Sequence, residues 1–153
     1  MGTKTPGSVK RSVFTSPSEV EQYFYEALRE ADLAKLMQTW ADDDDIVCIH
    51  PNGERLVGAQ AIQVSWKEIL EKGPLSIETR TPVIFHNGMT VIHTLIEKHY
   101  FATTHGQKEV LCYVTNIFHK NRTGWHLILH HASLAPADVI LNEMHISSNI
   151  LLH

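Results

Sequence analysis

The second half of the chain is a series of long apolar segments separated by short polar turns. The most regular pair runs from Leu111 to Pro136, where two apolar stretches flank the polar turn 120–124. Both stretches are rich in β-branched and aromatic residues, which favour strands, and Gly124 supplies the positive φ that a tight turn needs. This pattern predicts a long antiparallel hairpin. Because the apolar runs alternate little, both faces of its strands are expected to be covered.

Two more long strands are predicted before this hairpin. They run over Leu75–His86 and Met89–Thr103, and Asn87-Gly88 between them is a strong hairpin signal. A shorter strand is predicted over Ile46–Ile49, directly after four consecutive acidic residues at 42–45. That acidic run lacks the glycine and the closing glutamate of a calcium-binding loop, so we interpret it as a solvated turn.

The first half of the chain has a helical pattern. Ser16, Pro17 and Glu19 provide an N-cap, a first-turn proline and a capping-box acid, and apolar residues then recur at helical spacing. These apolar positions are Val20, Tyr23, Phe24, Ala27, Leu28 and Ala31. Asp32 can cap a second, short helix, and a third helix is expected to end at Gly73-Pro74.

Three helices that come mostly before the strands indicate an α+β fold, in which the helices cover one side of a strongly curved antiparallel sheet. The length of 153 residues is that of one domain. We expect this domain to span residues 16–136, between a mobile N-terminal arm at 1–15 and a C-terminal arm at 137–153. The C-terminal arm is too apolar for a free tail, so we expect it to pack on its own sheet or on a partner subunit.

Composition narrows the classes of partner. The formal net charge is -4 and no basic block occurs, so nucleic acid is not expected as a partner. No segment approaches the ~20 apolar residues of a membrane span, and the N-terminus has no hydrophobic signal core. We therefore expect no membrane association and a cytoplasmic location. Cys48 and Cys112 lie in apolar, strand-like runs and are interpreted as buried free thiols.

Polar residues interrupt the apolar strands. In the last hairpin they are Asn116, His130, His131 and Ser133. Each costs free energy unless it is hydrogen-bonded or faces a cavity, so these residues either satisfy one another in the core or line a pocket. On the preceding strand, Glu97 shares one face with His93 and His99. A zinc site needs three or four convergent ligands, and we expect no metal here.

As a set, these features resemble the nuclear transport factor 2-like superfamily, and more narrowly its SnoaL-like, ketosteroid-isomerase-related members. The resemblance covers residues 16–136. Its motifs are Trp40-Ala41-Asp42-Asp43-Asp44, His50-Pro51-Asn52-Gly53, Gly58, Ile62, Ser65-Trp66, Glu97, Thr115-Asn116-Ile117-Phe118, Gly124-Trp125 and His131-Ala132-Ser133. It implies a cystatin-like cone, in which helices close a bent sheet around a deep ligand cavity. It also implies a homodimer formed through the outer face of the sheet.

The resemblance further implies catalytic residues. The turn at His50 resembles the Asp-Pro-x-Gly turn that carries the general base of ketosteroid isomerases, so His50 is the candidate proton acceptor. Asn116 resembles the position of their protonated Asp and is the candidate donor to an oxyanion. Tyr23, on the apolar stripe of the first helix, and His131, by its spacing from Trp125, are further candidates. A bulge in the last strand would change the choice between His130 and His131.

The expected cavity combines His50 and Asn116 with apolar walls. The candidate ligand-binding residues are Trp40, Trp66, Glu97, Val114 and Phe118. The expected ligand is a small apolar organic molecule, because apolar walls with a few convergent polar groups are typical of ligand sites. No cofactor is expected.

Two classes of function remain open. The first is a cofactor-independent isomerase or dehydratase that removes a proton next to a carbonyl group. The second is a non-catalytic ligand-binding or dimerisation module, because the association domains of calmodulin-dependent kinases resemble this chain at its Trp…His…Ser hairpin. A His in place of the isomerases' Asp favours the second class. The polar cluster inside an apolar cone favours the first.

Overall fold

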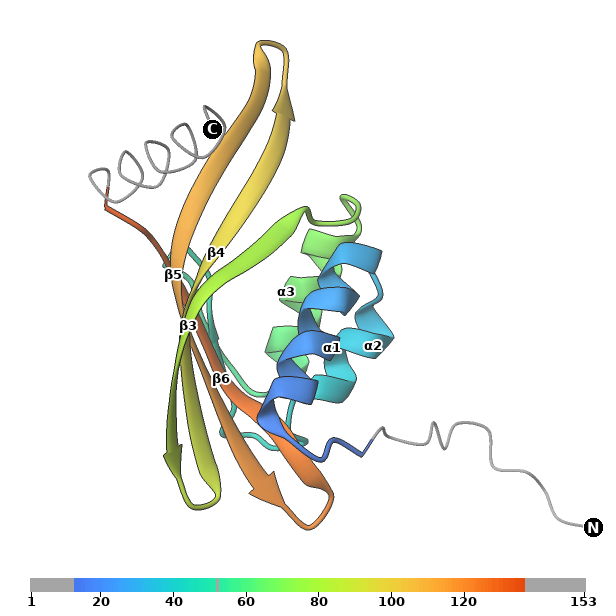
Figure 1. Ribbon diagram of the computed structural model, residues 1–153. Helices are drawn as coiled ribbons and strands as arrows, with labels where there is room; N and C mark the ends of the chain where they lie inside the picture. The colour runs from blue at the N-terminus through green and yellow to red at the C-terminus, as the bar shows by residue number, and fades with distance from the viewer. Residues whose placement is uncertain (1–12, 52, 137–153) are drawn as a thin grey trace, which may run out of the picture.

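The computed structural model describes residues 13–51 and 53–136, in which three helices cover one face of a six-stranded sheet (Figure 1). The helices are α1 (Pro17–Glu30), α2 (Leu33–Thr39) and α3 (Ala59–Leu70). The strands are β1 (Val47–Ile49), β2 (Arg55–Val57), β3 (Ile77–Asn87), β4 (Thr90–Thr103), β5 (Gly106–Asn121) and β6 (Gly124–Leu134). Residues 1–12 of the expected N-terminal arm and the whole expected C-terminal arm, 137–153, lie outside the described residues.

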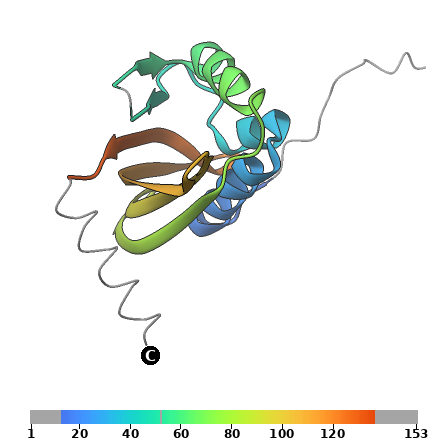
Figure 2. The same cartoon turned by 90° about the horizontal axis from the view of Figure 1, so that it is seen from above.

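The strands are ordered β2-β1-β6-β5-β4-β3 across the sheet. The four long strands form the predicted antiparallel meander, while β1 pairs parallel with β6 and antiparallel with the unpredicted β2. Seen from above, β1 and β2 lie beside α3 and turn away from the line of the long strands (Figure 2). The α+β arrangement predicted from the sequence is therefore confirmed. None of the described helices is long and apolar enough to cross a membrane.

The helix starts follow the predicted capping signals. Ser16 Oγ accepts a hydrogen bond from the Glu19 backbone N–H at 3.2 Å, and Asp32 Oδ1 accepts one from the Lys35 N–H at 3.0 Å. Each bond satisfies a donor that the first turn of a helix leaves unpaired. Ala31, between the two helices, has a φ of 54° and ends α1. The turn from α1 to α2 is thus specified locally.

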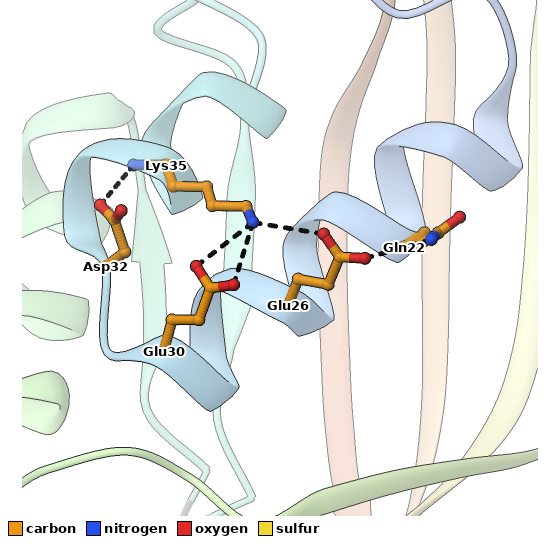
Figure 3. Close-up of polar contacts among 5 residues, drawn as sticks. All are labelled: Gln22, Glu26, Glu30, Asp32 and Lys35. Carbon is orange, nitrogen blue, oxygen red and sulfur yellow. Dashed lines mark hydrogen bonds and ion pairs between the residues drawn. The ribbon is translucent and has the colours of Figure 1, made fainter.

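Ion pairs link α2 back to α1. Figure 3 shows the Lys35 ammonium reaching two carboxylates of α1, Glu26 Oε2 at 3.2 Å and Glu30 Oε2 at 3.3 Å. Gln22 Nε2 donates to the other oxygen of Glu26 at 3.1 Å. The Lys35 ammonium also lies 4.6 Å from the centre of the Tyr23 ring. Because these carboxylates are largely exposed, we expect each pair to contribute little stability and mainly to fix the angle between the helices.

Two bulges bend the long strands. In β3 the register shifts between Arg80 and Val83. In β6, Phe118 of β5 pairs with Leu127 and Ile117 pairs with Leu129, which leaves Ile128 as an extra residue. A bulge increases the local bend of a strand and changes which residues face inward beyond it. The curvature of the sheet and the inward-facing set of β6 both follow from these positions.

The first described residues pack against the β5–β6 turn. The Phe14 side chain is buried, and its carbonyl oxygen accepts a hydrogen bond from the Trp125 N–H at 3.0 Å. Gly124 allows this approach, because its φ is 103° and a Cβ there would lie 2.6 Å from the Phe14 oxygen. Phe14, which falls within the expected N-terminal arm, therefore packs as part of the folded unit.

Candidate functional site

A cavity of about 370 Å³ lies between the helices and the concave face of the sheet. Its walls are mainly apolar and include Leu28 of α1, Trp66 and Ile69 of α3, Ile77 of β3, and Ala132 of β6. Its polar lining comes from His50, Glu97, His99 and His130, joined by the Cys112 thiol. An apolar cavity with a few polar groups on one wall matches the usual form of a small-molecule site.

A second hollow on the outside of α3 has a different character. It measures about 620 Å³, opens to solvent beside β2, and is bordered by Asp44, Glu54 and Glu68. Among the described residues, no group of three His, Cys, Asp or Glu side chains converges in a way that could hold a metal ion. The cavity under the helices is therefore the better candidate site.

A buried ion pair forms one wall of the cavity. Glu97 is buried, and its Oε1 lies 2.9 Å from Nε2 of His99, two residues along the same face of β4. Tyr25 of α1 donates its hydroxyl hydrogen to Glu97 Oε2 at 2.7 Å. Burial alone would raise the pKa of Glu97, but the hydrogen bond and charge of His99, together with the nearby His130 and the Tyr25 hydroxyl, outweigh it and hold that pKa below its usual range. The Glu97 carboxylate is therefore charged at neutral pH.

His99 is the cation of this pair. Burial disfavours charge on its ring, but the neighbouring Cys112 thiol and the Glu97 carboxylate raise the pKa of His99 to about 9. The ring therefore carries a proton on both nitrogens at neutral pH. The ring stacks on Phe101, with ring centres 6.2 Å apart, and both residues line the cavity.

Asn116 orders the polar groups behind the cavity. Its Nδ2 donates to Glu21 Oε2 at 3.1 Å and to the Tyr25 hydroxyl at 3.3 Å. Since a carboxylate can only accept, the amide nitrogen must face Glu21, and Oδ1 must face the other way. That oxygen lies 2.6 Å from Nδ1 of His130, so Nδ1 carries the hydrogen of this bond. Glu21 thus fixes the amide, and the amide fixes the tautomer of His130.

His130 is a neutral imidazole inside the cavity wall. Burial lowers the pKa of His130 to about 4. With its proton on Nδ1, the ring has an unprotonated Nε2, and no hydrogen bond to Nε2 is formed within the described part of the chain. Phe24 and Trp66 pack around the ring, with centres 5.1 and 6.1 Å away. The cavity therefore has a neutral proton acceptor and a charged proton donor on different residues.

His50 is a second neutral imidazole at the cavity. It follows β1, and its Nε2 shares a hydrogen bond of 2.9 Å with Ser65 Oγ of α3. The ring packs edge-on against Trp66, with centres 5.0 Å apart. Burial lowers the pKa of His50. One ring nitrogen of His50 is therefore already engaged by the protein.

Two of the predicted site residues have a different position. The prediction that Tyr23 points inward is wrong: its ring packs against Phe14 and under the Lys35 ammonium, on the side of α1 that meets α2. Tyr25 is the buried tyrosine beneath the helix. The prediction that His131 faces the cavity is also wrong, because the bulge at Ile128 turns His130 inward and leaves His131 exposed.

The remaining predicted residues divide into two sets. His50, Trp66 and Glu97 line the cavity, whereas Asn116, Val114, Phe118 and Trp40 do not. Successive inward-facing residues of β5 are about 7 Å apart. Cys112 lines the cavity, and Val114, Asn116 and Phe118 lie progressively farther from it along the strand. Phe118 packs on His93, with ring centres 4.9 Å apart, and Trp40 is bridged to Leu127 in the core. Asn116 reaches the cavity indirectly, through His130 and through the Tyr25 hydroxyl that donates to Glu97.

Sequence reasoning left Tyr25 and His99 out of the candidate site, and it favoured His131 over His130 while allowing that a bulge would reverse that choice. The shared face of Glu97 and His99 was visible as i, i+2 spacing, but their pairing with Tyr25 depends on how α1 crosses the sheet. The inward position of His130 depends on a bulge that has no local sequence signal. In each case the position of the side chain depends on how two elements pack or pair, which the sequence of a single element does not specify.

The family model of the SnoaL-like domain matches residues 18–138. The chain belongs to the SnoaL-like domain family. Its concave sheet and helix cover are shared with a solved structure of a proposed dehydratase of the NTF2-like family from Streptomyces avermitilis, at 24% identity and a TM-score of 0.71, covering 78% of this chain and 94% of that one. The expected cone-shaped, cystatin-like fold is thereby confirmed.

The chain is also similar to two proteins of other descriptions. A solved structure of a proposed calcium/calmodulin-dependent protein kinase type II association domain from Thiobacillus denitrificans is 27% identical, with a TM-score of 0.75, covering 82% of this chain and 99% of that one. The F-box protein SKIP8 of Arabidopsis thaliana is 23% identical over 119 residues, which are 78% of this chain. The chain spans 49% of that plant protein.

Proposed function

We propose that the cavity binds a small, largely apolar organic ligand with a carbonyl group, and that the protein acts on it as a cofactor-independent isomerase or dehydratase. The observation that supports this is the pair of histidines with opposite protonation, His130 neutral and His99 charged, at one cavity. Two titratable groups whose surroundings separate their pKa values are typical of acid and base roles. Both roles can be filled without a cofactor.

We assign the proton acceptor to His130 rather than to His50. Nε2 of His130 is unprotonated, whereas Nε2 of His50 is bonded to Ser65. A proton leaves the carbon next to the carbonyl group and binds to Nε2 of His130. The resulting enolate oxygen accepts a hydrogen bond from Nδ1–H of the His99 imidazolium, because Nε2 of that ring is bonded to Glu97. In an isomerisation the proton returns to another carbon. In a dehydration a hydroxyl group leaves as water, with the proton from Nδ1 of His99.

Asn116 has an indirect role in this scheme. Both hydrogens of its amide are bonded to Glu21 and Tyr25, so the expected oxyanion contact from Asn116 is replaced by one from His99. Asn116 is a positioning residue, because it holds the proton of His130 on Nδ1 and leaves Nε2 for the substrate. Trp66 and the aliphatic walls exclude water, which strengthens hydrogen bonds inside the cavity.

Deuterium exchange tests this proposal without knowledge of the natural substrate. A panel of cyclic ketones and enones is incubated with the protein in deuterated water, and deuterium entry next to the carbonyl group is followed by NMR. We expect catalysed exchange for at least one compound, and a loss of about 10²- to 10⁴-fold in His130→Gln. His105→Gln, an exposed site in the β4–β5 turn, should match the wild type. Exchange no faster than in buffer across the panel would contradict the catalytic proposal.

A second candidate function is a dimerisation module. It is supported by the 27% identity to the proposed kinase association domain, together with the outer face of the sheet, where Val83, Phe85 and Tyr113 are exposed. Exposed apolar groups on one sheet face favour association through that face. We propose a homodimer across it. Sedimentation at micromolar concentration should give a dimer, and Phe85→Glu with Tyr113→Glu should give a monomer, while His105→Glu should not. A wild-type protein that sediments as a monomer would contradict this.

A further inference from the structure

The two charged groups of the cavity wall, Glu97 and His99, form an ion pair with each other. Among the described residues that line the cavity, those with a charge at neutral pH are Glu97 and His99, and no lysine or arginine lies there. Glu97 Oε1 and His99 Nε2 are 2.9 Å apart, and Glu97 Oε2 accepts the Tyr25 hydrogen bond. Both oxygens of the carboxylate therefore have partners, and the formal charges at the wall sum to zero.

The other polar groups of the wall add no charge. His130 and His50 are both neutral at physiological pH, since burial lowers the pKa of each ring. The remaining lining is the Cys112 thiol together with aliphatic and aromatic groups, among them Leu28, Trp66 and Ile77. A charged ligand that entered this cavity would lose its hydration without gaining an unpaired counter-charge.

We propose that the Glu97–His99 pair makes the cavity selective for neutral oxygen-containing ligands, and against carboxylates and ammonium ions of the same size. An anion near His99 would be repelled by Glu97, and a cation near Glu97 would be repelled by His99. A neutral carbonyl compound costs far less to dehydrate and can accept a hydrogen bond from the His99 ring. This inference rests on the proposed function only in that the cavity binds a small organic ligand.

The pair predicts how the selectivity changes when either member is removed. His99→Gln leaves the Glu97 carboxylate without its cation, so an ammonium ligand can take the place of the imidazolium. Glu97→Gln removes the anion that raises the pKa of His99, so a carboxylate ligand can take its place beside the ring. The charge of the bound carboxylate itself favours the protonated ring, and a pH of about 6 favours it further, so the ligand gains a counter-ion.

Three probes with one ring skeleton test the inference: acetylcyclohexane, cyclohexanecarboxylate and (cyclohexylmethyl)ammonium. Binding is measured by ligand-observed NMR titration at about pH 7, and at about pH 6 for Glu97→Gln. On the wild type we expect the ketone to bind at least about ten-fold more tightly than either ion. His99→Gln should place the ammonium ahead of the carboxylate, and Glu97→Gln should place the carboxylate ahead of the ammonium. His105→Gln is the matched control and should keep the wild-type order.

The outcomes separate this inference from the proposed function. A wild-type protein that binds the carboxylate or the ammonium ion as tightly as the ketone overturns the inference, and that measurement needs no variant. An order of the two ions that neither variant changes overturns it as well. Selective ketone binding without catalysed deuterium exchange supports the inference and contradicts only the catalytic proposal. If none of the three probes binds to the wild type, the inference is overturned, whereas the catalytic proposal is decided by the deuterium-exchange panel.

Discussion

At the residue scale, Tyr25 and Tyr23 lie on the same helix, but their hydroxyl groups are expected to contribute differently to stability. The Tyr25 hydroxyl is buried, donates to Glu97 and accepts from Asn116. The Tyr23 ring packs at the surface against Phe14 and Lys35, and those contacts do not use its hydroxyl. A hydroxyl inside a buried network contributes more than one at a partly exposed ring, because its removal leaves two buried groups short of a partner.

We predict that Tyr25→Phe lowers the free energy of unfolding by about 1–3 kcal/mol, and that the matched variant Tyr23→Phe changes it by less than about 0.5 kcal/mol. Urea denaturation of both variants measures the difference. The Glu97 pKa should also rise in Tyr25→Phe, since one of the groups that lowers it is gone. Equal losses of stability in the two variants would show that the buried network is not what Tyr25 contributes.

Sequence reasoning identified the inward face of β5 but not the hydroxyl partner from α1. Alternation along a strand places Asn116 on the same face as Cys112 and Phe118, and all three are buried. On α1 the apolar stripe favours Tyr23, yet the helix is buried on two sides, by α2 and by the sheet. Tyr25 lies on the sheet side together with Glu21 and Leu28, at spacings of i, i+4 and i+7. Because Glu21 is polar, a search for apolar residues at helical spacing does not detect this second buried stripe.

At the element scale, local signals specified the ends of helices and the turns, while strand pairing decided which residues face inward. The caps at Ser16 and Asp32 are visible in the sequence because they act over three residues. The bulge at Ile128 is not, since an extra residue in β6 is defined only by the register with β5. A register shift of one residue in β6 makes His130 rather than His131 face inward, which reverses the prediction for the site.

At the scale of the whole molecule, the site depends on one pairing that no local pattern predicts. The parallel pairing of β1 with β6 places Cys48 opposite His130 and Ile49 opposite His131. His50, the next residue, then reaches the cavity from one side while Glu97 and His99 reach it from β4. Residues 50, 97 and 130 thus meet because the sheet curves and the helices close it. The sequence alone identified candidate residues on each element, but it did not predict that they meet at one cavity.

The same convergence predicts a pH optimum for stability. His130 has a pKa of about 4 in the folded protein against about 6.5 in an unfolded chain. Between these values the unfolded state binds more protons, so the free energy of unfolding rises as the pH rises. His99 has the opposite sign, because its folded pKa is about 9. From about pH 6.5 to 9 the folded state binds more protons, so the stability contributed by His99 is lost as the pH rises.

We therefore expect the free energy of unfolding to be greatest near pH 6.5, with each histidine contributing a change of about 3 kcal/mol across its own range. Glu97, whose pKa is lowered, adds to the loss on the acid side as the pH falls below its ordinary value. Chemical denaturation between about pH 4 and pH 9 measures the profile. His130→Gln should flatten the acid limb and His99→Gln the alkaline limb, whereas His105→Gln, at an exposed position, should change neither. Profiles for the two cavity variants that run parallel to the wild type would show that neither histidine has the shifted pKa on which the assignment of acid and base depends.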